Sequence, residues 1–182
     1  MLLAGDIGGT KTNLAIFASE ADPRTPLAEA TFPSARYPSL ESIVREFLAQ
    51  GNWKVTDASF GVAGPVVDGR AEITNLPWVV DQRNLQESLG LDSVCLLNDL
   101  TAIANSVPWL ESGDLCTLNE GRSAARGTMA VIAPGTGLGE AYLVWDGSGY
   151  RAFPSEGGHC DFAPADARQS GLLNYLRQQG LE

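Results

Sequence analysis

The sequence predicts an α/β protein in which a mixed sheet carries helices on both faces, followed by the start of a second, incomplete α/β domain. Three observations lead to this fold class. Apolar runs of strand length alternate with amphipathic segments over residues 1–110. A polar stretch with several glycines follows at residues 111–127, and a second strand, glycine turn and strand then begin at residue 128. We therefore expect a small domain at 1–110 and the beginning of a large domain at 111–182.

The first elements are three strands in a meander, followed by a helix. Residues 2–5 and 12–17 are apolar and flank a glycine-rich turn, and residues 27–32 follow a polar loop that contains proline. The segment 39–51 has apolar residues at helical spacing, Ser39 as an N-cap and Gly51 as a stop signal, and it predicts an amphipathic helix.

The rest of the small domain alternates strands and helices. A strand within DASFGVAGPVVDG ends at a Gly-Pro turn, and residues 71–81 predict a further extended segment. Residues 82–90 predict a short helix closed by a glycine, and the wholly apolar SVCLLN at 93–98 predicts a strand buried on both faces. A helix begins directly at the end of that strand, and Pro108 ends it.

The second domain begins with an apolar strand, a glycine turn and another apolar strand over residues 128–145. Residues 151–166 are expected to be irregular and polar. Residues 167–180 predict a final helix.

The composition excludes several classes of function. The chain has 182 residues with 12 Lys and Arg against 22 Asp and Glu, so its formal net charge is −10. No two basic residues are adjacent, and we expect neither nucleic acid nor an anionic membrane as a partner. The three cysteines are far apart, which disfavours a disulfide framework and suits a reducing cytoplasm. The first residues lack the features of a signal peptide, and no stretch approaches the ~20 apolar residues of a membrane span.

The turn GDIGGTKTN near the start of the chain predicts half of a metal–nucleotide site. Gly8 and Gly9 allow backbone N–H groups to approach a phosphate. Asp6 would repel a phosphate, so we expect it to hold a hydrated Mg²⁺ instead. The turn APGTGLG has a similar design, and two such turns facing each other would clamp a polyphosphate. The alternative is two ordinary β-hairpin turns.

Two further groups suit a sugar substrate. Asn98 and Asp99 follow a strand directly, where ligands of open α/β sheets collect. There Asn98 would fix a hydroxyl and Asp99 would accept a proton, while the alternative is a helix N-cap, for which one of the two residues suffices. Glu156 and His159 flank two glycines and suit vicinal hydroxyls. The alternatives for the lone histidine are a structural role or a metal site, although Glu156, His159 and Cys160 have poor zinc spacing.

Four segments in this order, LLAGDIGGTKTNLAIF, LLNDLTAIA, APGTGLG and SEGGHCDFAP, resemble the bacterial glucokinase family. These are ATP-dependent hexokinases in the superfamily of ATPases that includes actin. The resemblance covers essentially the whole chain and implies a ribonuclease H-like mixed sheet of the actin-like ATPase fold. It also implies phosphorylation of D-glucose at the 6-hydroxyl, feeding glycolysis, with ATP and Mg²⁺ as cofactors and a homodimer when the protein is full length.

The resemblance assigns a role to each matching position. The first phosphate loop, which contacts the ATP phosphates and Mg²⁺, corresponds to Gly5, Asp6, Ile7, Gly8, Gly9 and Thr10. The second phosphate loop corresponds to Gly135, Thr136 and Gly137, and Gly137 also approaches the sugar. Asn98 and Asp99 match the glucose-binding pair with Asp99 as the general base on the 6-hydroxyl, and Glu156 and His159 match the ligands of the ring hydroxyls.

One departure from the family concerns length. Members of the family continue beyond the position of residue 182 with an adenosine loop, a connecting helix and another sugar-binding glutamate. We therefore expect an amino-terminal portion that has little or no activity alone. Two alternatives stay open: a sugar kinase or sugar-sensing protein of the ROK family, although its cysteine-rich zinc motif is absent from this sequence, and a non-catalytic actin-like nucleotide-binding scaffold.

Overall fold

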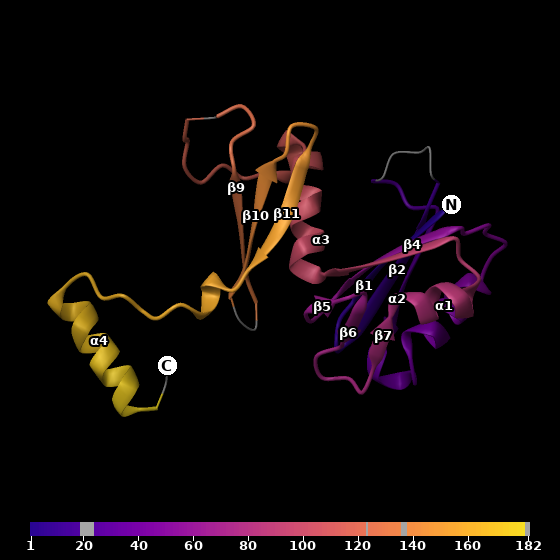
Figure 1. Cartoon of the computed structure of the whole chain (residues 1–182), viewed down its shortest axis with the longest axis horizontal. Coiled ribbons are helices and arrows are strands. Elements are labelled where there is room, and N and C mark those ends of the chain that lie inside the picture. The colour runs from indigo at the N-terminus through magenta and orange to yellow at the C-terminus, as the bar shows by residue number, and fades with distance from the viewer. Residues whose placement is uncertain (19–23, 123, 136–137, 181–182) are drawn as a thin grey trace. The chain divides into compact units, whose positions relative to one another are not determined.

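The computed structural model describes residues 1–18, 24–122, 124–135 and 138–180 (Figure 1). The chain divides into two compact units, Met1–Arg122 and Ser123–Glu182. The division lies within the polar stretch 111–127.

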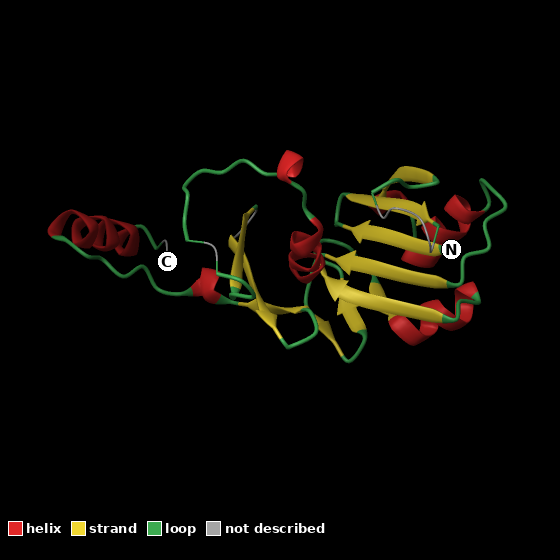
Figure 2. Ribbon diagram, turned by 90° about the horizontal axis from the view of Figure 1, so that it is seen from above, coloured by secondary structure: helices red, strands yellow, loops and turns green. Residues whose placement is uncertain are grey.

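The first unit is built on a five-stranded mixed sheet with the order β3-β2-β1-β4-β8. Figure 2 shows its strands lying side by side. The strands are β1 (Leu2–Ile7), β2 (Lys11–Phe17), β3 (Ala28–Pro33), β4 (Asp57–Val62) and β8 (Ser93–Asn98). The first three pair antiparallel, which confirms the predicted meander, while β4 is parallel to both β1 and β8. The carboxyl ends of β1, β4 and β8 therefore meet at one edge of the sheet.

One face of this sheet carries the main hydrophobic core. Helices α1 (Leu40–Leu48) and α2 (Gln82–Leu89) contribute to it, with Ser39 accepting the N-cap bond from Ser42 and Gly90 ending α2 in the left-handed conformation at φ 68°. The cluster is built from alternate residues of the strands and the apolar faces of the helices. Its fully buried members include Leu3, Ile7, Leu14, Ile16, Ile43, Phe47, Phe60, Val62 and Leu85.

Helix α3 (Asp99–Ser106) lies against the opposite face. A Cβ atom at Gly61 of β4 would lie 3.2 Å from the Cβ of Ala102, and Gly61 alternates with the core residues Phe60 and Val62. The sheet therefore carries helices on both faces, as the sequence predicted. A short 3₁₀ turn, η2 (Val107–Trp109), follows α3, so the α-helix ends just before Pro108, as predicted.

Residues 66–81 form more than the single extended segment that the sequence predicted for residues 71–81. They form a small antiparallel sheet of β5 (Val66–Val67), β6 (Arg70–Glu72) and β7 (Val79–Asp81). Between β6 and β7 the chain reverses at Asn75, whose φ of 65° is left-handed. The prediction was wrong because the run AEITNLPWVVD contains its own turn signal in an asparagine that tolerates this conformation.

The strand β8 was expected to be buried on both faces, and this was wrong. Its residues alternate, with Val94 and Leu96 in the core and Ser93 and Cys95 exposed. The reason is that only one face of β8 contacts the main core, and Ser93 and Cys95 lie on its other face.

The second unit contains a three-stranded antiparallel sheet of β9 (Met129–Pro134), β10 (Leu138–Trp145) and β11 (Tyr150–Ser155). It continues into the 3₁₀ turn η4 (Gly157–His159) and the predicted last helix, α4 (Ala167–Gln178). Strand β11 corrects the expectation of an irregular segment. It is an edge strand that tolerates Pro154, and that proline hid its alternating pattern in the sequence.

None of the helices in the described part of the chain has the length and hydropathy that a membrane span requires.

Candidate functional site

The carboxyl ends of β1 and β4, together with helix α3 that follows β8, line a cavity of about 330 Å³. Two acidic residues that lie far apart in the sequence, Asp6 and Asp99, both line it. Its remaining lining residues are Gly5, Gly61, Ala102, Ile103 and Ser106. The parallel pairing of β1, β4 and β8 thus brings the first predicted loop and the predicted base to one place.

The carboxylate of Asp99 is held through one of its two oxygens. Oδ1 accepts hydrogen bonds from the Asn98 amide at 2.9 Å and from the Leu100 N–H at 2.8 Å. In the described part of the chain, no donor reaches Oδ2. This arrangement fixes the orientation of the group and leaves one oxygen able to accept a proton.

Asn98 is the N-cap of α3, the structural role that the sequence also allowed for this pair. Its Oδ1 accepts from the N–H groups of Leu100 and Thr101, and its Nδ2 donates to Asp99 and to the Gly64 carbonyl at 3.1 Å. The side chain therefore joins the start of α3 to the loop after β4. Asp99, as the first helical residue, is not needed as the cap.

Gly61 determines how closely α3 approaches the sheet. Any side chain at this position would contact Ala102, and the added Cβ would also lie 3.7 Å from the Cα of Asp99. The glycine therefore allows the predicted base to sit over the end of β4.

The first phosphate loop is anchored by two buried hydroxyls that the sequence analysis missed. Ser34 Oγ donates to the Gly8 carbonyl at 2.8 Å, and the Ser34 N–H donates to the Thr10 carbonyl at 3.1 Å. Thr12 Oγ1 lies 3.0 Å from Ser34 Oγ, and both side chains are fully buried. Since the one hydroxyl proton of Ser34 goes to Gly8, Thr12 is the donor of this pair. A threonine at a core-facing position of β2 was the signal that could have found them.

The loop also presents donors. The N–H of Gly8 is bonded to the Lys11 carbonyl at 2.9 Å, whereas no acceptor within the described residues contacts the N–H groups of Gly9 or Thr10. Gly9 has no room for a side chain, because a Cβ atom would lie 2.6 Å from the Thr74 carbonyl oxygen. The loop is thus held at its carbonyls and open at two amides.

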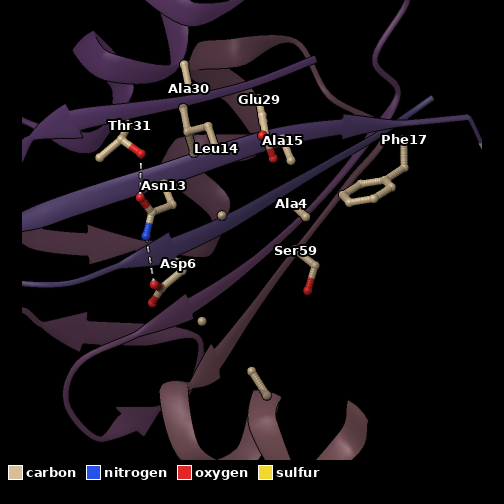
Figure 3. Close-up of a pocket in the computed structure, with 13 residues that line it drawn as sticks. Ala4, Asp6, Asn13, Leu14, Ala15, Phe17, Glu29, Ala30, Thr31 and Ser59 are labelled. Carbon is tan, nitrogen blue, oxygen red and sulfur yellow. Dashed lines mark hydrogen bonds between the residues drawn. The ribbon is translucent and has the colours of Figure 1, made fainter. Parts of the chain in front are cut away.

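Asp6 belongs to a chain of hydrogen bonds across three strands (Figure 3). Asn13 Nδ2 donates to Asp6 Oδ2 at 3.1 Å, and Thr31 Oγ1 donates to Asn13 Oδ1 at 2.8 Å. All three side chains line a wider hollow of about 700 Å³ on the sheet face opposite the core.

The second unit carries the other predicted residues. Gly135 follows β9, while Thr136 and Gly137 lie outside the described residues. The segment Glu156–His159 packs against the start of β10, since a Cβ atom at Gly157 would overlap the Glu140 carboxylate and one at Gly158 would overlap the Leu138 carbonyl. Glu156 and His159 are exposed, with Oε2 and Nε2 3.6 Å apart. This loop lies against β10, the strand that follows the second phosphate turn in the sequence.

A comparison with protein families bears on this arrangement. The family model described as Glucokinase matches residues 3–181. The chain belongs to the glucokinase family. The predicted resemblance to bacterial glucokinases is therefore confirmed.

Curated relatives of this glucokinase-family chain agree. It is 40% identical over 178 residues to a glucokinase of Nostoc punctiforme, covering 97% of this chain and 52% of the relative. It is 34% identical over 178 residues to a glucokinase of Tolumonas auensis, covering 98% of this chain and 55% of the relative. The chain thus spans about half the length of the curated relatives it matches.

Solved structures confirm the predicted fold class. A crystal structure of a glucokinase from an Antarctic psychrotroph matches with a TM-score of 0.86 and 32% identity, covering 98% of this chain and 56% of that one. A ROK family protein from Streptococcus pneumoniae matches with a TM-score of 0.55 at 17% identity, covering 99% of this chain and 62% of that one. The ROK likeness shows a shared fold alone.

Proposed function

We propose that the protein carrying this chain is an ATP-dependent glucokinase, which transfers the γ-phosphoryl group of ATP to the 6-hydroxyl of D-glucose and releases glucose 6-phosphate and ADP. One observation carries the proposal. In a chain of the glucokinase family, Asp99 has one oxygen fixed by two hydrogen bonds and one that no donor among the described residues contacts, and it lines the same cavity as Asp6.

Asp99 acts as the general base. Asn98 and the Leu100 N–H hold Oδ1, so Oδ2 takes the proton of the 6-hydroxyl as its oxygen attacks the phosphorus.

The first phosphate loop binds the polyphosphate through backbone amides. The N–H groups of Gly9 and Thr10 are the available donors, and Ser34 fixes the loop from behind by holding the carbonyls of Gly8 and Thr10. Gly135 and Thr136 are proposed to bind phosphate in the same manner. Backbone donors suit this chain, whose net charge of −10 disfavours a lysine cluster.

The residues of the cavity fit Mg²⁺, which Asp6 would hold through water. No group of three or more histidine, cysteine or acidic residues in the described part of the chain forms a closed metal cage. Magnesium instead keeps several waters and is bound through one or two carboxylates together with substrate phosphates. When bound, it neutralises charge on the transferring phosphoryl group.

The sugar is proposed to bind through Asn98, Asp99, Gly137, Glu156 and His159. Both side chains of the Glu156–His159 segment are exposed and able to contact vicinal hydroxyls. The Asn98 amide already donates to Gly64, so a sugar hydroxyl would share or replace that contact. A cytoplasmic location fits the three free cysteines. The predicted homodimer stays a prediction.

The decisive experiment replaces Asp99 by asparagine in the full-length enzyme. We expect kcat to fall by about 10²-fold or more with KM for glucose changed less, because the base is lost while its shape is kept. Asp92→Asn is the matched control, since Asp92 precedes β8 at the opposite end of the sheet. A kcat within a few-fold of the parent would remove Asp99 from its proposed role.

A coupled assay for ADP tests the alternatives. Glucose, mannose and water are compared as acceptors. A glucokinase forms ADP fastest with glucose, whereas ADP formation without sugar would favour an actin-like ATPase scaffold, and a preference for another hexose would favour a different sugar kinase.

A further inference from the structure

We infer that Asn13 is a positioning residue for Asp6 and is itself oriented by Thr31. Asn13 holds one carboxylate oxygen of Asp6. The other oxygen is left to face the water shell of a divalent cation bound with the nucleotide. The inference rests on the proposed function and assigns a role to two residues outside the phosphate loops.

The strand register places these three residues in a line. Asp6 of β1 lies directly opposite Asn13 of β2, and Asn13 lies directly opposite Thr31 of β3. Directly opposite side chains of antiparallel strands are close enough to interact on one face of the sheet. The contacts of 3.1 Å and 2.8 Å follow from this register, and Figure 3 shows them as a continuous chain.

The chemistry of the three groups permits one orientation of the Asn13 amide. An ionised carboxylate only accepts hydrogen bonds, so the NH₂ group of Asn13 must face Asp6. Its carbonyl oxygen then faces Thr31, whose hydroxyl can donate to it. If the amide turned over, two acceptors would meet at Asp6. Thr31 therefore stabilises the orientation that Asp6 requires.

The consequence concerns the other oxygen of Asp6. Asn13 occupies Oδ2, and no donor within the described residues contacts Oδ1. A carboxylate with one fixed oxygen presents the second in a narrow range of directions, and Asp6 lines a cavity together with Asp99. Magnesium demands near-ideal octahedral geometry, so the orientation of an outer acceptor for its waters matters.

The test uses the full-length enzyme and measures its binding of Mn²⁺ with ATP by electron paramagnetic resonance. Binding of ATP alone is measured in the presence of a chelator. Mn²⁺ replaces Mg²⁺ because both prefer oxygen ligands in octahedral geometry. Thr31→Val and Asn13→Leu should each weaken Mn²⁺ binding in the presence of ATP by about threefold to tenfold. Asn13→Leu removes the hydrogen bond to the charged Asp6 carboxylate, and Thr31→Val removes the bond that orients the Asn13 amide. Thr31→Ser keeps the hydroxyl and should bind Mn²⁺ with ATP as the parent does. Binding of metal-free ATP should stay unchanged in all three variants.

Thr56→Val is the matched control. Thr56 also donates to a carboxylate, that of Asp57 at 2.7 Å, but it lies at the opposite end of β4. Its variant should bind Mn²⁺ with ATP as the parent does. A general loosening of the sheet would weaken metal-dependent and metal-free binding alike, and that result would overturn the inference.

A second measurement needs no ligand. The side-chain amide resonances of Asn13 should shift in both Asp6→Ala and Thr31→Val, because each removes a hydrogen-bond partner of the amide. Unchanged resonances would overturn the inference. A full-length parent that binds neither form of ATP would instead overturn the proposed function. A full-length parent that binds Mn²⁺ with ATP, together with variants that bind it equally well, would overturn the inference alone.

Discussion

At the scale of single residues, the site depends on side chains that have every hydrogen bond made. Asn98 uses both its oxygen and its NH₂ group, and Ser34 uses its N–H and its hydroxyl. A fully bonded polar side chain holds its neighbours in one arrangement, because any movement leaves a buried or half-buried group without a partner.

Ser34→Ala should show this most clearly. The change removes the partner of the Gly8 carbonyl and leaves the buried Thr12 hydroxyl without an acceptor. We expect the free energy of unfolding to fall by about 1–3 kcal/mol, as measured by urea denaturation. In the full-length enzyme, KM for ATP should rise as well.

The matched control for this change is Ser42→Ala. It deletes a hydroxyl that bonds only within the first turn of α1, to the Ser39 carbonyl. An equal loss of stability in both variants, with KM for ATP unchanged, would show that Ser34 does not hold the phosphate loop.

The residues proposed to touch substrate are those that the sequence singles out, whereas the residues that support them were not predicted. Asp6, Asp99 and the glycines are revealed by local motifs, because a turn or a strand end dictates their residue types. Thr12, Asn13, Thr31 and Ser34 act through contacts across strands. Those contacts depend on register, which one sequence does not state.

At the scale of elements, α3 is placed by a contact between two small residues. Gly61 of β4 meets Ala102 of α3, and the same helix begins at the Asn98 cap. A glycine in a strand often marks such a close approach of another element.

Gly61→Ala should therefore impair the reaction more than it impairs folding. The new Cβ would lie 3.2 Å from the Cβ of Ala102, so α3 must move by a few tenths of an ångström. We expect kcat to fall about threefold to tenfold in the full-length enzyme. Misplacing a catalytic group by about an ångström can lower kcat by about 10²-fold, and the shift expected here is smaller.

A double variant provides the control. Gly61→Ala with Ala102→Gly should recover kcat while lowering stability, since glycine within a helix costs about 1 kcal/mol. Gly113→Ala should change neither, because a Cβ at that position meets open space. Failure of the double variant to recover activity would contradict the packing argument.

The stability of the turn between β10 and β11 should depend on pH. The backbone N–H and hydroxyl of Ser148 and the N–H of Gly149 donate to Asp146 and lower its pKa to about 2. A carboxyl with a lowered pKa in the folded state stabilises the fold above its ordinary pKa, here 3.8, and this stabilisation is lost as the pH falls toward about 2.

An NMR titration of the Asp146 carboxyl carbon measures this directly. Its midpoint should lie near pH 2, and Ser148→Ala should raise it because one donor is removed. A midpoint at the ordinary value for aspartate would show that the turn is open in solution.

At the scale of the whole molecule, buried apolar residues are distributed unevenly. Among the described residues, every buried hydrophobic residue except Ala141 and Leu143 lies in the first unit. Helix α4 has no buried residue, and large apolar side chains such as Ile132 and Tyr175 are exposed in the second unit. The first unit thus has a core of its own, and the second has little.

Hydrogen exchange followed by mass spectrometry should separate the two units. Amides of β1, β4 and β8 should exchange much more slowly than those of β9–β11 and α4 in the 182-residue chain, because local stability follows buried apolar contacts. Uniform protection across the chain would contradict this expectation.

The close fit of Gly157 and Gly158 onto β10 has a mechanical consequence. Gly158 lies against the Leu138 carbonyl and Gly157 against the Glu140 carboxylate, so the segment before His159 has no room to slide along the start of β10. We therefore expect a ligand that displaces the first residues of β10 to displace His159 as well. Binding at the glycine turn before that strand would then change the position of the imidazole directly.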